Sequence, residues 1–192
     1  MYAYKRIYHF LQINYHFSDT EIAKFKYTIE VLFYELSKVL FFLLFFGITH
    51  KLADFAVCFF ILLPFRSFSG GLHFKRYISC FLFSVLYFSA LIFLLCEIPV
   101  APVYKAILLI LCSIILFVTG PVPSKKRPVM NLRQYRIFRG ITISFALIYS
   151  FLILFVDDLP YKNLMFWSVV LHTLQISCAR IARKGDTIHE KT

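Results

Sequence analysis

Acidic residues and glycines are scarce in this sequence, and paired cysteines are missing. Its 192 residues contain 10 Asp and Glu against 21 Lys and Arg, and only 6 Gly. Because there is no Cys-x-x-Cys pair, a structural zinc site has little support. The five cysteines are scattered in or beside apolar runs, a pattern that does not suggest a disulfide framework. We therefore expect neither a metal nor a cofactor.

Internal repeats, low-complexity tracts and a phosphate-cradling glycine loop are also absent from the sequence. The missing loop argues against an ATP-driven transporter. The absence of repeats favours a single domain over residues 1–192. The first residues lack a continuous apolar core followed by a cleavage site, so we expect no removable signal peptide.

Apolar residues dominate what is present. They make up 60% of the chain, with 24 Phe and a mean hydropathy of +0.74. Crossing a hydrocarbon core of about 30 Å takes roughly 20 apolar residues in a helix, and the solid run at 39–46 does not alternate as a barrel strand would. The sequence predicts an all-α polytopic membrane bundle of about six transmembrane helices, near 21–47, 52–65, 78–96, 103–119, 140–156 and 164–182.

Two boundaries carry specific signals. Ser18 and Glu21 fit a capping box at the start of the first crossing, and Pro64 is expected to end the second crossing at about residue 65. Residues 1–17 carry apolar and aromatic side chains at helical spacing, which predicts an amphipathic helix in the headgroup plane. A helix packed on the bundle fits that pattern equally well.

Basic residues indicate the orientation. Only Lys51, Lys105 and Lys162 fall in the gaps on one side, and Lys38 lies inside the first crossing. The other side holds seventeen: Lys5, Arg6, Lys24, Lys26, Arg66, Lys75, Arg76, Lys125, Lys126, Arg127, Arg133, Arg136, Arg139, Arg180, Arg183, Lys184 and Lys191. The positive-inside rule places both termini and the loops near residues 70 and 130 in the cytoplasm. Topology thus explains most of the net charge of +11, and we expect no nucleic-acid partner.

The segment from Arg66 to Cys80, at the junction of the second and third crossings, carries the candidate chemistry. Adjacent Gly70 and Gly71 suggest a sharp turn or a close backbone approach. His73 and Cys80 supply a base and a thiol nucleophile. In one straight helix they would lie about 10.5 Å apart along the axis, so we expect Cys80 in the first turns of the third crossing and His73 on a loop or folded-back segment before it. Spacing alone favours a plainer interpretation, an interfacial histidine beside a packed cysteine.

Two motifs resemble a known family. The pattern Arg-x6-His-x6-Cys with glycine two before the histidine, formed by Arg66, Gly71, His73 and Cys80, resembles the signature of the accessory gene regulator B (AgrB) family, membrane cysteine endopeptidases of quorum sensing in Gram-positive bacteria. The stretch 120–128 resembles the family's proline-basic-proline cytoplasmic loop. The length and the six crossings agree, so the resemblance covers nearly the whole chain.

The resemblance implies a reaction and its partners. Cys80 would be the nucleophile and His73 its base and later its acid. The substrate would be an amphipathic, AgrD-like propeptide with an acidic C-terminal tail, cut through an acyl-enzyme thioester to give a cyclic thiolactone or lactone signal. The family also implies a homodimer in the bacterial plasma membrane, with the site on the cytoplasmic side.

Other charged residues have two interpretations each. The cluster Lys125, Lys126 and Arg127 could dock the acidic tail or merely orient the bundle. Arg66 could bind a substrate carboxylate or anchor the interface. Glu30 could orient His73 as a third member of the site.

The remaining candidates have plainer interpretations. Glu35 and Lys38 are three residues apart, a spacing at which they can neutralise each other. His172 and Trp167 are expected to pack or to anchor the interface. A packing role is also expected for four of the cysteines, Cys58, Cys96, Cys112 and Cys178.

The alternative function is a small peptide transporter or export channel without peptidase chemistry. It rests on the six crossings and on the ionisable Glu30, Glu35 and Lys38 inside the first of them. A non-enzymatic assembly subunit is a third possibility, but it leaves the glycine pair unexplained.

Overall fold

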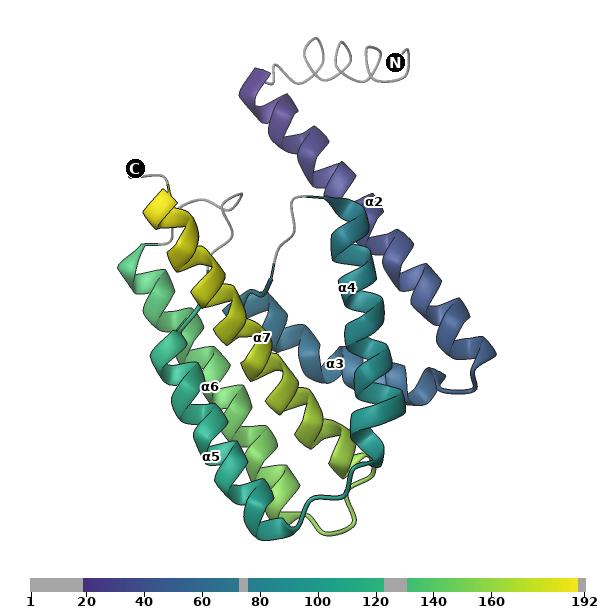
Figure 1. Cartoon of the computed structure of the whole chain (residues 1–192). Helices are drawn as coiled ribbons and strands as arrows, with labels where there is room; N and C mark the ends of the chain where they lie inside the picture. The colour runs from purple at the N-terminus through teal and green to yellow at the C-terminus, as the bar shows by residue number, and fades with distance from the viewer. Residues whose placement is uncertain (1–18, 73–75, 123–130, 190–192) are drawn as a thin grey trace. The chain divides into compact units, whose positions relative to one another are not determined.

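Helices account for most of the described part of this chain. The computed structural model describes residues 19–72, 76–122 and 131–189. Along them lie α2 (Asp19–Ile48), α3 (Leu52–Ser69), α4 (Tyr77–Ser89), α5 (Pro102–Thr119), α6 (Leu132–Phe155) and α7 (Lys162–His189) (Figure 1). The all-α prediction is confirmed. The predicted interfacial helix at 1–17 and Ser18 of the predicted capping box lie outside the described residues.

Contacts divide the chain into two units, Met1–Phe45 and Phe46–Thr192, and each is described by itself. Most of α2 belongs to the first unit. Within it the Lys38 ammonium lies 2.6 Å from Glu35 Oε1, which confirms the predicted neutralising pair. The helix runs without interruption over the whole of the predicted crossing at 21–47.

Five stretches of the second unit are long and apolar enough to cross a membrane: Leu52–Ser69, Tyr77–Glu97, Pro102–Thr119, Leu132–Phe155 and Lys162–Ala182. In the second of them α4 continues through a π-helical turn, η1 (Ala90–Leu94), and a 3-10 turn, η2 (Leu95–Glu97). They match the last five predicted crossings in order, so the polytopic helical bundle is confirmed. Among the described residues α2 is not one of these stretches, and a sixth crossing stays a prediction.

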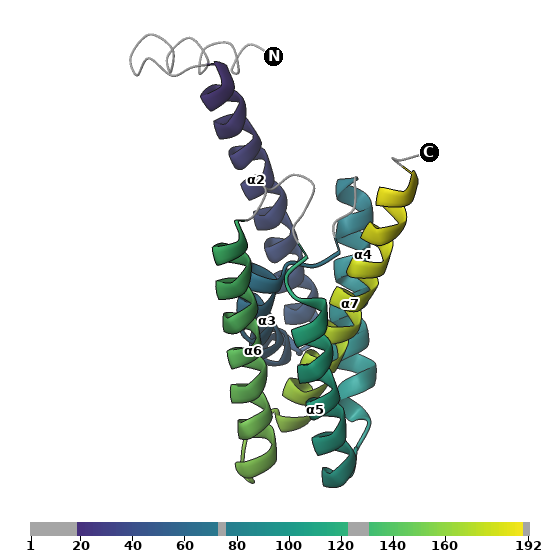
Figure 2. The same cartoon turned by 90° about the vertical axis from the view of Figure 1, so that its left-hand side faces the viewer.

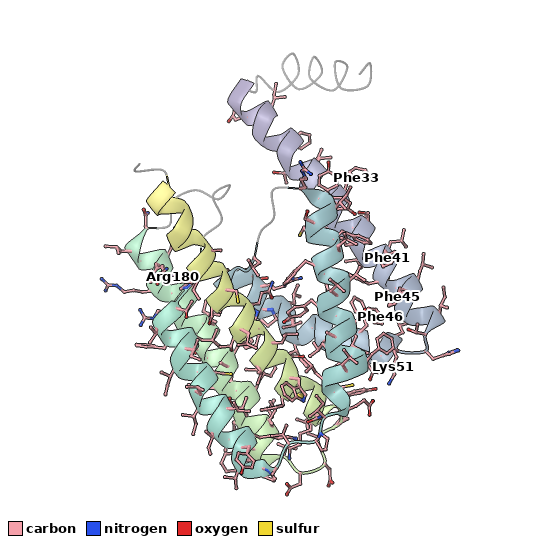
Figure 3. All side chains as sticks on the ribbon, in the orientation of Figure 1. Phe33, Phe41, Phe45, Phe46, Lys51 and Arg180 are labelled. Atoms are coloured by element: carbon pink, nitrogen blue, oxygen red, sulfur yellow. The ribbon has the colours of Figure 1, made fainter. Side chains whose placement is uncertain are left out.

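The core of the second unit forms around α7, the most buried of the five stretches, which packs against α3, α5 and α6. Large buried side chains from these four helices fill it: Phe65, Leu109, Leu116, Ile153, Phe166, Val169 and Ile176. The last turn of α2 belongs to this unit and carries Phe46 (Figure 3). The Phe46 ring stacks on that of Phe55 at 5.0 Å and on that of Phe93 at 6.0 Å. The apolar rings thus fix the start of the unit to α3 and η1.

The second crossing is longer than predicted. We expected it to end at residue 65, but α3 continues to Ser69 with Pro64 inside it. Proline removes a single donor, and membrane helices tolerate it where other groups satisfy the backbone. The missing N–H leaves only the Phe60 carbonyl without its helical donor; the hydroxyls of Ser67 and Ser69 donate to other carbonyls, those of Leu63 and Phe65, at 2.8 and 2.6 Å. The predicted boundary at 65 is therefore wrong.

The fifth crossing begins earlier than the predicted residue 140. α6 begins at Leu132. The prediction missed this start because it followed the apolar run, which excludes the arginines of the first turns, Arg133, Arg136 and Arg139. Arginine can keep its stem among apolar groups while its guanidinium reaches water or an aromatic face. The Arg139 guanidinium carbon lies 3.9 Å from the centre of the Phe117 ring on α5. The predicted start is wrong for that reason.

The ends of α3 and α5 meet backbone to backbone. Val122 N–H donates to the Ser69 carbonyl at 2.9 Å, and Gly70 pairs with Val122 in a single parallel bridge. Gly70 has a φ of +82°, and a Cβ on it would lie 2.5 Å from the Val122 carbonyl oxygen. Gly120, at φ +61°, ends α5 where a Cβ would overlap the Tyr135 hydroxyl of α6. The expected close backbone approach is confirmed at Gly70.

This backbone bridge between Gly70 and Val122 lies inside the unit, below the level that α6 and α7 reach. α5 has 18 residues and α6 has 24, so α5 is shorter by about 9 Å at 1.5 Å per residue. α5 accordingly ends below the start of α6 and the end of α7 (Figures 1 and 2). Residues 120–122 are buried there, surrounded by helices that continue past them.

Replacing Gly70 by Ala should destabilise the protein, whereas the same change at Gly140 should not. At Gly70 the left-handed backbone costs a side chain about 1–3 kcal/mol, and the added Cβ overlaps a carbonyl oxygen. At Gly140, inside α6, a Cβ meets nothing within 4 Å, so Ala should be neutral or stabilising by roughly 0.5–1 kcal/mol. Thermal unfolding of both variants in detergent micelles measures the difference. Equal midpoints would contradict the constraint assigned to Gly70.

Candidate functional site

The structure describes four of the predicted site residues. Arg66 lies in the last turn of α3, Gly70 and Gly71 follow that helix directly, and Cys80 lies in the first turn of α4. We expected Arg66 in the connection between the crossings, and that position is wrong because α3 runs on to Ser69. The other predicted residues lie outside what is described: His73, Lys125, Lys126, Arg127 and the side chain of Glu30.

Cys80 is half-buried at the start of α4. Its N–H donates to the Arg76 carbonyl at 3.2 Å. Arg76 itself has extended backbone, with φ −103° and ψ 139°, so the helix that carries Cys80 begins after it. The expected position of Cys80 in the first turns of the third crossing is confirmed. Its contact with His73 stays a prediction, because residues 73–75 lie outside the described part.

The face of α4 that carries Cys80 also carries Tyr87, whose ring contacts Arg66 of α3. Cys80, Ser84 and Tyr87 follow one another at helical spacing, and both Ser84 and Tyr87 are buried. The Arg66 guanidinium carbon lies 5.8 Å from the centre of the Tyr87 ring. Cys80 is therefore on the same side of α4 as Tyr87, about 10.5 Å from it along the axis toward the start of the helix.

His172 of α7 contacts the last turn of α3. Its ring is fully buried, lies 4.9 Å from the Phe65 ring between centroids, and places Nε2 2.8 Å from Ser69 Oγ. The Ser69 hydroxyl donates its single hydrogen to the Phe65 carbonyl at 2.6 Å, so its oxygen accepts from His172 Nε2–H. Nδ1 is then left as an acceptor, and it has no hydrogen-bond partner among the described residues.

The expectation that His172 packs or anchors the interface is therefore incomplete. It does pack on Phe65, but it also bonds to the residue that precedes Gly70. A titratable side chain inside a membrane span is itself a signal for function, and that signal could have identified His172. The indole N–H of Trp167 donates to the Ile98 carbonyl at 3.3 Å at the other end of the unit, and its role as an interface anchor stays a prediction.

Gln175 lies one turn beyond His172 on α7 and was not among the predicted site residues. Its side chain is 5% exposed, and neither Nε2 nor Oε1 has a hydrogen-bond partner among the described residues. A Cβ on Gly71 would lie 3.4 Å from Nε2, so the missing side chain at Gly71 leaves the backbone directly against the amide. A polar residue one turn from a histidine inside an apolar span is the sequence pattern that could have identified Gln175 as a site residue.

The cysteines and acidic residues offer no second chemical centre. All five cysteines are free. Cys58 and Cys112 are buried, as expected of packing residues, whereas Cys178 is exposed on the face of α7 turned away from the core, so its predicted packing role is wrong. Over residues 19–72, 76–122 and 131–189, no group of three or more His, Cys, Asp or Glu could hold a metal ion.

Comparison with known proteins agrees with the motifs. The family model for accessory gene regulator B matches residues 4–176. A protein of Clostridium beijerinckii whose name describes it as AgrB-like is 29% identical over 169 residues, which cover 88% of this chain and 83% of that protein. No solved structure matches the chain. With both motifs present and the family model covering nearly its whole length, the chain belongs to the accessory gene regulator B family.

Proposed function

We propose that this protein is a membrane-embedded cysteine endopeptidase that removes the C-terminal tail of a quorum-sensing propeptide and closes the remainder into a thiolactone or lactone ring. Membership of the family supports a role in processing quorum-sensing peptides. The peptidase proposal itself rests on Cys80. Its half-buried thiol lies in the first turn of α4, on the same face as Tyr87, which contacts Arg66.

In the proposed reaction His73 takes the proton of the Cys80 thiol, and the sulfur attacks the carbonyl carbon of the scissile bond. The tetrahedral intermediate collapses, the C–N bond breaks, and His73 gives its proton to the leaving amine. The propeptide remains attached as a thioester. Its internal Cys or Ser then gives a proton to His73 and attacks the thioester carbonyl. The Cys80 sulfur leaves, regains its proton, and the ring is closed.

Ring closure in place of hydrolysis requires that little water reach the thioester. Support for such a site comes from the bridge between half-buried Gly70 and buried Val122, which lies below the level that α6 and α7 reach. The Arg66 guanidinium, held over the Tyr87 ring, is suited to bind a carboxylate of the substrate. We infer that the site and both termini face the cytoplasm of a bacterial cell, because seventeen of the 21 basic residues fall on that side of the predicted topology. The family resemblance adds the expectation of a homodimer.

The transporter alternative depends on charged residues in the first crossing. Of these, Lys38 and Glu35 form an ion pair at 2.6 Å. Because their charges neutralise each other, their presence in the first crossing is explained without a transported ion. The two proposals differ in one observable. A transporter retains flux across proteoliposomes when Cys80 and His73 are replaced, whereas the peptidase loses its product.

Replacing Cys80 by Ala should abolish cleavage of the propeptide, with a loss on the order of 10³-fold or more because the nucleophile is gone. Cys80→Ser should be nearly as damaging, since a hydroxyl is a much weaker nucleophile than a thiol at neutral pH. Co-expression with a candidate propeptide and mass spectrometry of its products measures both. Cys178→Ala, which changes an exposed thiol on α7, is the matched control and should retain activity. Continued cleavage by Cys80→Ala contradicts the proposal.

Neutralising the basic cluster should weaken binding of the acidic tail. Replacing Lys125, Lys126 and Arg127 by Gln should raise KM several-fold, and added salt should reduce the difference from the unaltered protein because exposed charges are screened. Lys105→Gln, on the opposite side of the predicted topology, is the control. A propeptide whose tail carries Asn and Gln should lose the difference. If the neutral tail shows the same rise in KM, the cluster only orients the bundle.

A further inference from the structure

Three buried polar side chains from two helices surround the end of α3, and each leaves polar atoms without a hydrogen-bond partner among the described residues. Tyr87 of α4 contacts Arg66, His172 of α7 bonds to Ser69, and Gln175 of α7 lies against Gly71. The unpaired atoms are Tyr87 Oη, His172 Nδ1, and both Nε2 and Oε1 of Gln175. They are gathered along Arg66–Gly71, the first half of the segment that leads to Cys80.

Such groups are costly inside a membrane bundle. Buried polar atoms without partners are rare in native structures, and each one calls for an explanation. The other polar residues buried on α7 show the usual solution. The hydroxyls of Ser168 and Thr173 each donate to a carbonyl of their own helix at 2.8 Å. His172 and Gln175 are the side chains whose hydrogen-bonding capacity points out of the helix.

Other unpaired atoms of the described residues differ in kind. Asn163 Oδ1 is unpaired, but the same amide already donates to the carbonyls of Cys96 and Ile98 and so has a structural role. Arg139 Nε is unpaired, but its guanidinium lies over the Phe117 ring. Gln175 has no such second role, because neither atom of its amide is bonded.

The chemistry of these groups identifies their ligand class. The carboxamide of Gln175 presents a donor beside an acceptor, the same pair that a backbone peptide group presents in reverse. His172 Nδ1 is an acceptor only, since Nε2 holds the hydrogen, and it fits an N–H group. Gly71 has no side chain, so its backbone lies directly against the buried Gln175 amide. Pairing of this kind is independent of the ligand's side chains.

We propose that Gln175 and His172 form a subsite that binds the peptide backbone of the substrate next to the bond that is cut. This proposal rests on the proposed function and extends it to two residues outside both family motifs. The substrate segment lies along the end of α3, with a backbone peptide group paired to the Gln175 amide and a neighbouring N–H donated to His172 Nδ1. Gln175 thereby holds the scissile segment in register with Cys80.

The test compares affinity with stability. Cys80→Ala removes the nucleophile and allows binding to be measured without turnover. The ligand is a synthetic propeptide that the unaltered protein cleaves. In the Cys80→Ala background we expect Gln175→Leu to lower the affinity for this propeptide by about fivefold to thirtyfold, as for the loss of one or two hydrogen bonds. Its thermal midpoint without peptide should stay equal or rise, because an apolar group replaces an unpaired amide. Thr173→Val, a buried change on the same helix at a satisfied hydroxyl, should change neither quantity.

Two further measurements locate the contact. A propeptide methylated on the backbone nitrogens that flank the scissile bond should bind the Cys80→Ala protein more weakly than the unmethylated propeptide does. Adding Gln175→Leu to that protein should then reduce the affinity for the methylated propeptide little further, since both changes remove the same pairing. Gly71→Ala, which puts a methyl group 3.4 Å from the Gln175 amide, should weaken binding, whereas Gly140→Ala should not. These variants keep the test decisive if Gln175→Leu folds poorly.

Each contrary result has a distinct meaning. If the unaltered protein cleaves the propeptide and Gln175→Leu binds it equally well, the subsite proposal is overturned and the proposed function stands. The subsite proposal is also overturned if the thermal midpoint of the Gln175→Leu variant falls, because the amide is then structural. It is overturned as well if Gln175→Leu in the protein that retains Cys80 shifts the pH profile of cleavage without changing KM, because the amide then acts on the base. If the unaltered protein cleaves no propeptide, the proposed function fails and the subsite fails with it.

Discussion

The hydrogen bond between the Ser69 carbonyl and the Val122 amide is the contact on which the arrangement of the site depends. It joins the end of α3 to the end of α5 and brings together the two segments that carry the family motifs. Gly70 is required there, because a side chain would overlap the Val122 carbonyl and the backbone is left-handed. Two further contacts follow from this position, Ser69 against His172 and Gly71 against Gln175.

The central helix of the second unit combines two kinds of buried polar group. Ser168 and Thr173 satisfy their hydroxyls within α7 and can be accommodated in an apolar bundle at little cost. His172 and Gln175 keep atoms unpaired, and both lie beside the last residues of α3. Local departures from full satisfaction are expected at functional sites. The position of these two residues therefore agrees with a site built where α7 lies against the end of α3.

Apolar runs predicted the helices well where the spans are uniformly apolar. The third and fourth crossings, predicted at 78–96 and 103–119, correspond to Tyr77–Glu97 and Pro102–Thr119. The prediction failed where a local rule met a membrane context. Pro64 does not end α3, because proline removes only one N–H donor and the backbone stays helical after it as far as Ser69. The arginines of α6 do not delay its start, because their stems tolerate apolar surroundings.

The site was predictable only in part. Gly70 and Cys80 could be anticipated from glycine conformation and from helical rise, because both arguments are local. The roles of His172 and Gln175 could not, because they depend on α7 lying against α3, more than 100 residues apart in the chain. Periodicity assigns residues to a face of a helix but does not say which helix covers that face. That pairing is a tertiary property.

The most direct test of a cysteine peptidase at Cys80 is to trap the acyl-enzyme. A propeptide whose internal Cys or Ser is replaced by Ala cannot close the ring, so the thioester should accumulate. Intact-protein mass spectrometry should then show the protein carrying the propeptide without its tail, attached at Cys80 and released by hydroxylamine. An adduct on another cysteine, or cleavage of the propeptide by a protein that never carries one, would contradict the account.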